Sequence, residues 1–535
     1  MIRDVLAEAV RSALAELGVE PPAAVDLERP ARREHGDWST NVALTVAKAV
    51  GRKPRELADA LAERLRAAPP IHVSAVEVAG PGFVNFRLRD SWLHDILGDV
   101  VEQGEDRYGR HDLGAGERVQ VEFVSANPTG PLHVGNGWWG SYGDALARVL
   151  IRCGYQVSRE YYVNDTGGQI RSLGESLLAI RRGAPVPESG YQGAYVAELA
   201  RAYDGPDDEV AAGRWAAERN LADIRETLAA MGIEFDEWFS QASIEESDAV
   251  AETIALLRER GLVFEDDGAV WLRTADFGDP RERRVLVKSD GEFTYLAGDL
   301  AYHRDKFLVR GYDRVIDVFG ADHQGQVDSL LAGVEALGVE RGRLEIEIGQ
   351  MVSLVSGKMS KRAGNFVPLR DLIDDLGPDV TRLLSLLTSL DSAPLLDLDK
   401  VRATSHESPV YYVQMAHARI AGIGRTARDR AIDRLPLEQV DLSLLVHERE
   451  LEVLRSLSEL PDVVLGACVD RAPHRVATWV RELADRFHGF YHDCWVIGEG
   501  VSPELTQARL WLVETARIGL AIGLGLLGVH APDRM

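Results

Sequence analysis

Residues 118–137, RVQVEFVSANPTGPLHVGNG, decide the fold that this sequence predicts. The first seven alternate apolar and polar side chains, as a half-buried strand does, and a loop rich in glycine and proline follows. Residues 138–153 have the apolar period of a helix that ends at Gly154, and residues 157–163 alternate again. A strand, a glycine-rich loop, a helix and a second strand make one βαβ unit, which is typical of nucleotide-binding parallel sheets.

A second unit of this kind occurs further along the chain. Its expected elements are a strand at 315–319, a helix at 327–337 and a strand at 344–348. The sequence therefore predicts an α/β, Rossmann-type domain with a parallel sheet over residues 113–400. An acidic stretch at about 170–280 has helical periodicity, and we expect it to be a helical insertion in this domain.

Different patterns flank the predicted Rossmann-type domain. Residues 1–112 show helical periods that end near Gly18 and Ala67, followed by two alternating segments around the turn Gly80-Pro81-Gly82, so we expect an α+β domain. Residues 401–535 have helical period almost throughout and predict an all-α helical bundle.

Charge is unevenly distributed over the 535 residues. The chain has 60 basic and 85 acidic side chains, a formal net charge of −25, which argues against broad binding to nucleic acid because phosphate contacts need Lys and Arg. Residues 1–110 and residues 401–535 each carry 15 basic and 18 acidic side chains, whereas residues 111–400 carry 30 and 49. Any contact with nucleic acid is therefore expected on local basic patches, chiefly of the two terminal domains.

The cysteines and the apolar segments limit the compartment. Cys153, Cys468 and Cys494 lie far apart, which excludes a disulfide framework and a thiolate zinc site and fits a reducing compartment. The N-terminus lacks the apolar core of a signal peptide, and the longest apolar run, 518–529, is shorter than the roughly 20 residues of a membrane span. We therefore expect a cytoplasmic protein with no membrane contact, no zinc and no other resident metal.

Two loops carry the candidate chemistry. In the first, residues 125–136, glycines allow close approach of a ligand, and the following helix would point its positive end at an anion. The second, SGKMSKRAGN at residues 356–365, would bring the ammonium groups of Lys358 and Lys361 to a triphosphate. Taken singly, the first is as well explained by a strand-to-helix turn with a buried His133, and the second by a solvated basic turn.

Together the loops resemble the HIGH and KMSK motifs of class I aminoacyl-tRNA synthetases. Five longer segments resemble the arginyl-tRNA synthetases in particular: VEFVSANPTGPLHVGN at 121–136, REYYVNDTGGQI at 159–170, FTYLAGDLAYHRDKF at 293–307, FGADHQGQ at 319–326 and PVYYVQMAHARI at 409–420. The resemblance extends from residues 34–38 to residues 531–535. It implies an arginine–tRNA ligase that acts as a monomer on L-arginine, on ATP with Mg²⁺ and on tRNA(Arg).

The resemblance also implies roles for individual residues. The catalytic residues would be His133, Asn136, Lys358 and Lys361, and the ATP site would add Gly130, Pro131, Gly135, Met359 and Ser360. The arginine site would comprise Glu122, Ser125 and Asn127 toward the α-amino and carboxylate end, Tyr295 and Asp299 at the guanidinium, and His323 or Gln324. Contacts with tRNA would come from Arg32, Arg33, Tyr411, Tyr412, Gln414, His417 and Arg419. Asn164 and Asp165 could line the same cleft, although a helix cap explains Asp165 equally well.

One position departs from the family pattern, because Asn136 stands where the second histidine of HIGH is expected. Asparagine keeps a hydrogen-bond donor and an acceptor but cannot carry positive charge. This leaves open how much stabilisation of the transition state comes from this position.

Three other functions fit parts of the sequence. Another class I synthetase, such as the cysteinyl enzyme, would need thiolate zinc ligands, and the predicted Rossmann-type domain contains only Cys153. A small nucleotidyltransferase with an HxGH loop would be much shorter and would lack the helical domain. A non-catalytic tRNA-binding paralogue is favoured only by Asn136 and is opposed by the intact motif Lys358-Met359-Ser360-Lys361.

Overall fold

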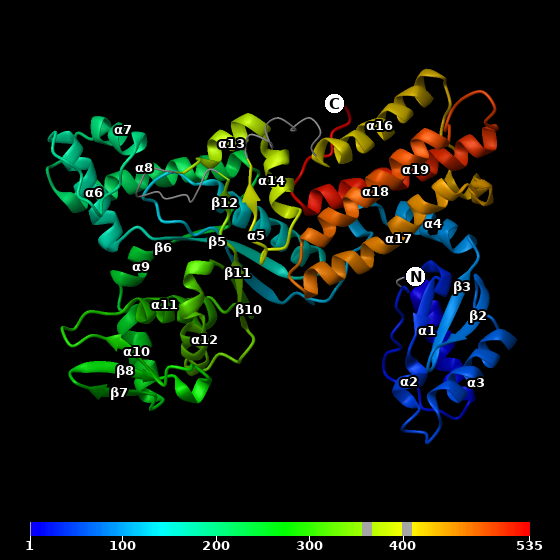
Figure 1. The fold of residues 1–535 in the computed structure, drawn as a ribbon, viewed down its shortest axis with the longest axis horizontal. Coiled ribbons are helices and arrows are strands. Elements are labelled where there is room, and N and C mark those ends of the chain that lie inside the picture. Colours follow the sequence, from blue (N-terminus) through cyan, green and yellow to red (C-terminus); the bar gives the residue numbers. More distant parts are fainter. Residues whose placement is uncertain (1, 31, 356–365, 398–408) are drawn as a thin grey trace. The chain divides into compact units, whose positions relative to one another are not determined.

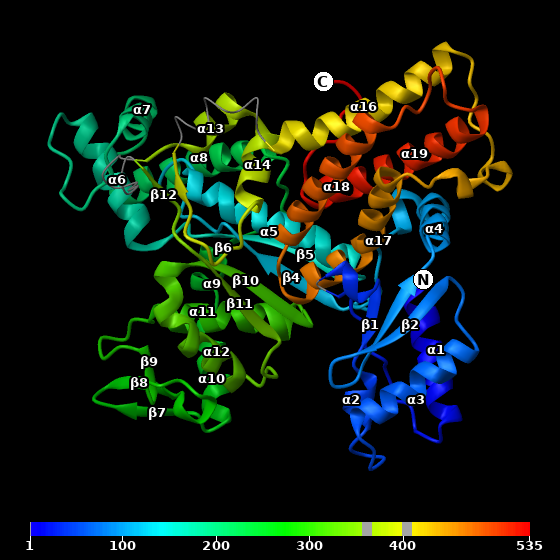
Figure 2. The same ribbon diagram turned by 45° about the vertical axis from the view of Figure 1, so that its right-hand side comes forward.

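The computed structural model describes residues 2–30, 32–355, 366–397 and 409–535 (Figures 1 and 2). The chain forms two compact units, and each draws on distant parts of the sequence. The first unit contains residues 1–108, 420–459 and 485–519, and the second contains residues 109–419, 460–484 and 520–535. The C-terminal helices therefore contribute to both units.

The N-terminal part of the first unit is the α+β fold that the sequence predicts. Its elements are α1 (Ile2–Glu16), β1 (Trp38–Thr40), α2 (Val42–Val46), α3 (Pro54–Ala67), β2 (Val73–Ala79), β3 (Phe83–Leu88) and α4 (Ser91–Arg107). The strands form an antiparallel sheet in the order β1-β3-β2, and the apolar faces of α1 and α3 contribute to the core that also includes Trp38 and Phe86. Strand β1 and helix α4 were not anticipated from the sequence.

The C-terminal helices are α16 (Pro409–Asp429), α17 (Glu448–Val469), α18 (His474–Asp493) and α19 (Pro503–Leu526), which confirms the expected all-α region (Figure 1). Within the first unit they are tied to the N-terminal residues by polar contacts. The hydroxyl of Tyr108 donates to the carbonyl of Leu457 at 2.8 Å, and Arg517 pairs with Glu105 at 2.7 Å.

The second unit is built on a five-stranded parallel sheet in the order β11-β10-β4-β5-β6, which confirms the Rossmann-type prediction. These strands are β4 (Arg118–Glu122), β5 (Gln156–Val163), β6 (Glu237–Ser240), β10 (Arg314–Gly320) and β11 (Leu344–Gly349). Helix α5 (Val134–Arg152) lies on one face of the sheet, and α11 (Tyr295–Arg304) and α12 (Val327–Ala336) lie on the other (Figure 1). The direction of winding reverses between β4 and β10, the place where open α/β sheets bind ligands.

Two expectations were wrong in detail. Helix α5 begins at Val134, not after Gly137, because His133 caps it, so the motif HVGN forms the helix start instead of the loop before it. The stretch 170–280 is not purely helical, since β6 is the edge strand of the central sheet. Its other elements are α6 (Gly167–Arg181), α7 (Ala194–Ala202), α8 (Glu209–Ala230), α9 (Gln241–Glu245), α10 (Ala249–Glu259), and the strands β7 (Val263–Asp266) and β8 (Ala269–Arg273), which pair with β9 (Arg283–Val287).

Short elements complete the second unit. They are β12 (Ser353–Leu354), α13 (Leu369–Leu376), α14 (Pro378–Leu386) and β13 (Leu395–Leu396), with one π-helical turn at Asp305–Val309 that directly follows α11. Turns of this kind are rare and often occur at functional sites.

Candidate active site at the carboxyl end of the sheet

Three carboxylates stand side by side near the carboxyl ends of neighbouring strands. The parallel register places Glu122 of β4 opposite Asp317 of β10 on one side and opposite Glu160 of β5 on the other. All three side chains are buried. Buried carboxylates in a row repel one another, so this arrangement requires cations within hydrogen-bonding distance. We refer to Asp317, Glu122 and Glu160 as the acidic row.

Helix α11 and the π-helical turn supply the cations on the Asp317 side. The ammonium group of Lys306 donates to Glu122 Oε2 at 2.7 Å and to Asp317 Oδ1 at 2.8 Å, and its side chain is fully buried. Imidazole Nε2 of His303 lies 2.9 Å from Asp317 Oδ2, and its Nδ1 lies 2.7 Å from the carbonyl oxygen of Asp299. Burial opposes ionisation, yet the charges of Lys306 and His303 lower the pKa of Asp317 to about 2.

The same helical segment also reaches the other end of the acidic row. The hydroxyl of Tyr302 lies 3.0 Å from Glu122 Oε2 and within hydrogen-bonding distance of Glu160, so its single proton bridges two carboxylates. Arg310 binds Glu160 with two nitrogens. Burial favours the protonated form of Glu160, but the hydrogen bond from Arg310 and the charge of Lys306 lower its pKa.

Asp299 is the exception in this cluster. It lies on α11 and is partly exposed, and its carboxylate has no hydrogen-bond or ion-pair partner among the described residues. Burial raises its pKa to about 6, against the attraction of His303 and with further repulsion from Glu122. Tyr295, predicted beside it at the guanidinium, is 87% exposed at the first turn of α11. Asp299 can therefore accept an external cation without losing an internal one.

The turn that follows β4 holds Glu122 from the other direction. Val124 and Ser125 both have left-handed backbones, with φ of 69° and 36°, an uncommon conformation for a β-branched residue. The hydroxyl of Ser125 donates to Glu122 Oε1 at 2.9 Å and accepts from the amide of Tyr162 at 3.1 Å. Consecutive strained residues of this kind persist only where the surroundings enforce them, and they cluster at active sites.

The remaining residues predicted for the amino-acid site lie around this cluster. Asn127 is half-buried, and its amide donates to Gln169 Oε1 at 2.7 Å. His323 and Gln324 lie in the exposed turn after β10, where His323 Nε2 is 3.6 Å from Asp322 Oδ2. Because the charge of His323 acts on the Asp299 carboxylate, the structure brings these two predictions together.

The first loop ends in a reciprocal cap. Nδ1 of His133 accepts from the amide of Asn136 at 3.3 Å, and Oδ1 of Asn136 accepts from the amide of His133 at 3.1 Å. The side chain of Asn136 is buried, and its oxygen serves as a hydrogen-bond acceptor for the main chain at the start of α5. The capping arrangement orients the imidazole and leaves the helix start pointing toward the strand ends.

Glycines in this loop are required by what lies against them. A Cβ at Gly135 would lie 3.0 Å from Cε1 and 3.1 Å from Nδ1 of His133, so a larger residue would displace the imidazole. A Cβ at Gly130 would lie 2.9 Å from the ring of Tyr195, whose hydroxyl donates to the carbonyl of Thr129 at 3.0 Å. Pro131 is half-buried between them.

The whole second loop, residues 356–365, lies outside the described residues, and with it the predicted site residues Lys358, Met359, Ser360 and Lys361. Its flanks are described. Val355 donates through its amide to the carbonyl of Leu396 at 3.0 Å on one side. On the other side, Val134 donates to the carbonyl of Val367 at 3.2 Å, and Leu369 donates to that of Leu132 at 2.8 Å. The segment that follows the second loop is therefore hydrogen-bonded to the first loop.

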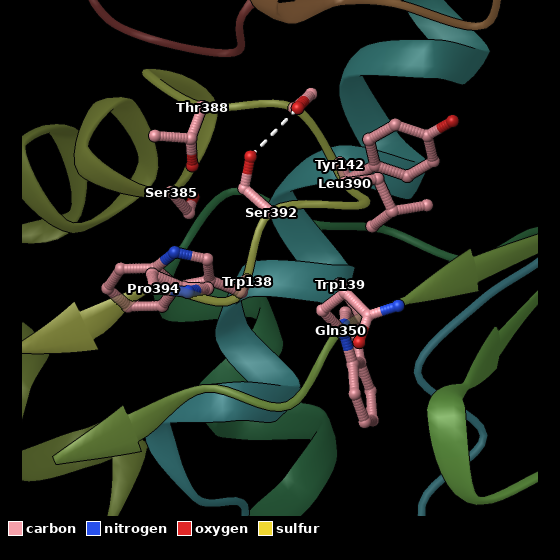
Figure 3. A pocket seen from close by; sticks show the side chains of 10 residues that line it. Trp138, Trp139, Tyr142, Gln350, Ser385, Thr388, Leu390, Ser392 and Pro394 are labelled. Carbon is pink, nitrogen blue, oxygen red and sulfur yellow. Dashed lines mark hydrogen bonds between the residues drawn. The ribbon is translucent and has the colours of Figure 1, made fainter.

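A shallow pocket lies beside α5, between Trp138, Trp139 and the segment 385–394 (Figure 3). Its lining consists of Trp138, Trp139, Tyr142, Gln350, Ser385, Thr388, Ser389, Leu390, Ser392 and Pro394. The indole of Trp139 also lies against the backbone of Gly320, since a Cβ there would be 3.0 Å from it. None of the described residues predicted for substrate binding lines this pocket, and its packing supports the segment that leads into the second loop.

The residues predicted to contact tRNA differ in their surroundings. Tyr412 and Arg419 of α16 are exposed, and Tyr411 is half-buried. Gln414 and His417 are buried, and they hold the C-terminal segment through the carbonyls of His530, at 2.9 Å, and Pro532, at 2.9 Å. In the first unit, Arg33 pairs with Glu448 at 2.8 Å and Arg32 with Glu34 at 3.5 Å.

Sequence reasoning missed six members of the charged cluster: Glu160, Tyr302, His303, Lys306, Arg310 and Asp317. A signal was present, because Tyr302, Lys306 and Arg310 follow one another at intervals of four residues, which is helical spacing, and His303 is adjacent to the first of them. Acidic residues near the ends of three apolar strands were their natural partners. In the described parts of the chain, no group of three or more His, Cys, Asp or Glu side chains is arranged to hold a metal ion. No helix among the described residues is long and apolar enough to span a membrane.

Comparisons with known proteins agree along the whole chain. Family models match at residues 4–88 (Arginyl tRNA synthetase N terminal domain), 207–422 (tRNA synthetases class I (R), catalytic domain) and 413–535 (DALR anticodon binding domain). The arginine–tRNA ligases of Frankia alni and Kineococcus radiotolerans are each 45% identical over 555 residues, which covers 100% of this chain and 99% and 98% of theirs.

Solved structures show the same relationship. An arginyl-tRNA synthetase structure from Campylobacter jejuni is 30% identical with a TM-score of 0.74 and covers 84% of this chain and 100% of its own. The arginyl-tRNA synthetase of Thermus thermophilus, at 22% identity, shares the fold over 100% of both chains with a TM-score of 0.79.

Proposed function

The chain belongs to the arginyl-tRNA synthetase family, and from this membership we propose that it is an arginine–tRNA ligase. It activates L-arginine with ATP to arginyl-adenylate and transfers the arginyl group to the 3′-terminal ribose of tRNA(Arg), releasing pyrophosphate and AMP. The observation that carries the proposal is the buried acidic row beside the carboxylate of Asp299, which has no hydrogen-bond or ion-pair partner in the described parts of the chain. Such a site requires a cation. Relatives named arginine–tRNA ligase over their full length favour this function over a non-catalytic paralogue or another class I synthetase.

At the amino-acid end, Asp299 receives the guanidinium of the substrate, with Tyr295 beside it. A guanidinium is planar and never deprotonates, so an accessible carboxylate is its natural partner. Glu122, Ser125 and Asn127 lie toward the α-amino and carboxylate groups. His323 or Gln324 contributes a further contact from the turn after β10.

At the nucleotide end, ATP arrives with Mg²⁺ as a substrate complex. The loop residues Gly130, Pro131 and Gly135 let the phosphates approach the start of α5, whose amide groups favour anions. Because Nδ1 of His133 accepts from Asn136, the neutral imidazole carries its hydrogen on Nε2 and donates to a phosphate oxygen. Lys358, with Met359 and Ser360, and Lys361 stabilise the charge on the departing pyrophosphate.

The chemistry requires no protein nucleophile. An oxygen of the arginine carboxylate attacks the α-phosphorus, the bond to the β-phosphate oxygen breaks, and pyrophosphate leaves. The 2′-hydroxyl of the terminal ribose then attacks the activated carbonyl, and AMP departs. Catalysis therefore rests on positioning and on stabilisation of developing charge.

Two parts of the chain bind the tRNA. Residues 401–535 bind the anticodon stem and loop, and residues 1–112 bind the elbow, by stacking on unpaired bases and by phosphate contacts. Tyr411, Tyr412 and Arg419 offer side chains on α16, and Arg32 and Arg33 do so in the N-terminal domain. Gln414 and His417 contribute by holding the C-terminal segment against α16. We place the enzyme in the cytoplasm as a monomer. Size-exclusion chromatography with light scattering tests the oligomeric state.

Aminoacylation of total tRNA with each of the twenty amino acids tests the function. Arginine alone should be attached, and the charged species should be tRNA(Arg). Attachment of another amino acid, or of none, would refute the proposal. Supplying tRNA in every arginine-activation assay is essential, because family members usually activate arginine only with tRNA bound.

A further inference from the structure

The cluster around Glu122 contains a lysine that substrate contacts do not explain. Resting on the proposed function, we propose that Lys306 is a positioning residue for the amino-acid substrate. Its buried ammonium group fixes Glu122 and Asp317 as ionised acceptors. It thereby sets the position of the negative charge that selects a cationic amino acid. Lys306 itself touches neither arginine nor ATP in this assignment, and it acts through the two carboxylates that it binds.

The helical segment 299–310 is arranged as one support for the acidic row. Tyr302, His303, Lys306 and Arg310 project from α11 and the π-helical turn onto three neighbouring strands, at hydrogen-bonding distances in each case. The fifth member of the segment, Asp299, is joined to the network by its own carbonyl oxygen, which accepts from His303 at 2.7 Å. The position of the Asp299 main chain is therefore linked through His303, Asp317 and Lys306 to Glu122.

Counting charges shows what the cluster is missing. The carboxylates are Asp317, Glu122, Glu160, Asp299 and Asp305, which pairs with Arg310 at 2.6 Å, and the permanent cations are Lys306 and Arg310. Both nitrogens of His303 face oxygen atoms. Negative charge therefore exceeds positive charge in the cluster, and the carboxylate without a partner among the described residues is that of Asp299. Arginine, a zwitterion with an added guanidinium, has a net charge of +1 and offsets part of this excess.

Lys306 has the central place in this balance because its single charge is shared by two carboxylates. Burial raises the pKa of Glu122, and the adjacent ammonium group of Lys306 counteracts that rise. Without it, Glu122 or Asp317 would take up a proton near neutral pH. The pocket would then keep its net charge but lose one ionised acceptor, and the orientation of both carboxylates would no longer be fixed. A lysine that only filled space would leave the pH dependence of arginine binding unchanged.

The test compares Lys306→Met, which keeps most of the length of the side chain and removes its charge, with Lys288→Met as the matched control. Lys288 is exposed and pairs only with Glu292 among the described residues. Arginine-dependent pyrophosphate exchange with tRNA present gives KM for arginine and for ATP between pH 5.5 and 8.5, and circular dichroism confirms folding. For Lys306→Met we expect the arginine KM to rise at least tenfold, the ATP KM to change less than twofold, and the acid limb of the arginine profile to move at least one pH unit upward.

Asp317→Asn is a second variant, for which the acid limb of the arginine profile should shift in the opposite direction. It removes one negative charge that faces Asp299 and leaves Lys306 to Glu122 alone, so the acid limb should move downward. The groups that face Asp299 in this experiment are Glu122 of β4, Tyr162 of β5, His303 of α11, Asp317 of β10 and His323 after β10. Lys306→Arg, which keeps the charge, should recover most of the arginine affinity with the wild-type pH profile.

Several outcomes would overturn the assignment. A folded Lys306→Met enzyme with the wild-type arginine KM and pH profile would do so, as would equal losses for arginine and ATP. If Lys306→Met does not fold, an Asp317→Asn profile that coincides with the wild type is sufficient to reject it. These results are distinct from failure of the proposed function, in which the wild-type protein itself would not attach arginine to tRNA.

Discussion

The two ends of the active site present different chemical groups to their substrates. At the nucleotide end the described contacts are mostly those of backbone and neutral groups: the helix start, two glycines and the reciprocal cap of His133 and Asn136. At the amino-acid end, carboxylates on three strands face cations from one helical segment. Main-chain dipoles can therefore hold an anion, whereas selection of a guanidinium requires fixed negative charge.

The difference should also appear in how each end fails. A site made of backbone groups should be more sensitive to added volume than to added charge, and a site made of ion pairs should behave in the opposite way. Substitutions at the two ends should therefore separate cleanly between arginine and ATP.

Replacement of the open carboxylate should cause the largest loss. Asp299→Asn keeps the shape of the side chain and removes its charge, so the guanidinium loses a partly desolvated ion pair of about 3–5 kcal/mol. We expect the arginine KM to rise by roughly two to four orders of magnitude with an ATP KM within twofold of the wild type. Pyrophosphate exchange with tRNA present measures both constants.

Stability distinguishes this loss from misfolding. The pKa of Asp299 is about 6 in the folded protein against an ordinary value of 3.8, so its ionised form destabilises the fold above pH 6. Asp299→Asn should thus melt at a higher temperature than the wild type at pH 7.5. The exposed Asp276→Asn is the control and should change neither property. A variant with lower stability and equal losses for both substrates would contradict the role of Asp299.

At the nucleotide end, Gly135→Ala should reverse the pattern. The added methyl group would meet the imidazole of His133 at about 3 Å and displace it from the phosphates. We expect kcat for arginine activation to fall about 10- to 100-fold, as small misplacements of a catalytic group do, with the affinity for arginine unchanged. Calorimetric titration of arginine and pre-steady-state adenylate formation give the two values. Gly98→Ala on α4, where a Cβ meets nothing within 4 Å, is the matched control.

These experiments also show where sequence reasoning ends. Motif resemblance indicated Glu122, Asp299 and His133, because each lies within a short segment whose neighbours are informative. Glu160 and Lys306 lie in segments that the resemblance also covers, but it assigned them no role. Their partnership depends on the register of three parallel strands and on a π-helical turn, which no local pattern indicates. The burial of Gln414 and His417 likewise depends on the C-terminal segment, which is more than 100 residues away in sequence.

The pH dependence of arginine binding should be steep on the acid side only. Arginine binds the ionised form of Asp299, whose pKa is raised to about 6. The affinity for arginine is therefore highest above pH 6 and decreases as the pH falls below this value. We expect the dissociation constant to rise about tenfold per pH unit below 6. Calorimetry without ATP avoids the titration of the triphosphate. A flat profile between pH 5 and 7 would mean that Asp299 is not the titrating acceptor.

The smallest effect is expected where a family histidine is replaced by Asn136. Because Oδ1 of Asn136 caps the amide of His133, Asn136→Ala should cost about 1 kcal/mol in the free energy of unfolding, measured by urea denaturation. Asn136→Asp keeps the capping oxygen and adds a negative charge, so it should retain most of that stability while raising the ATP KM several-fold by repulsion. If the aspartate variant loses stability as well, the side chain contributes through its amide group instead of its cap. If both variants bind ATP normally, Asn136 is a structural residue of the helix start. ATP binding at this end then depends on backbone groups and His133, without a contribution from the side chain of Asn136.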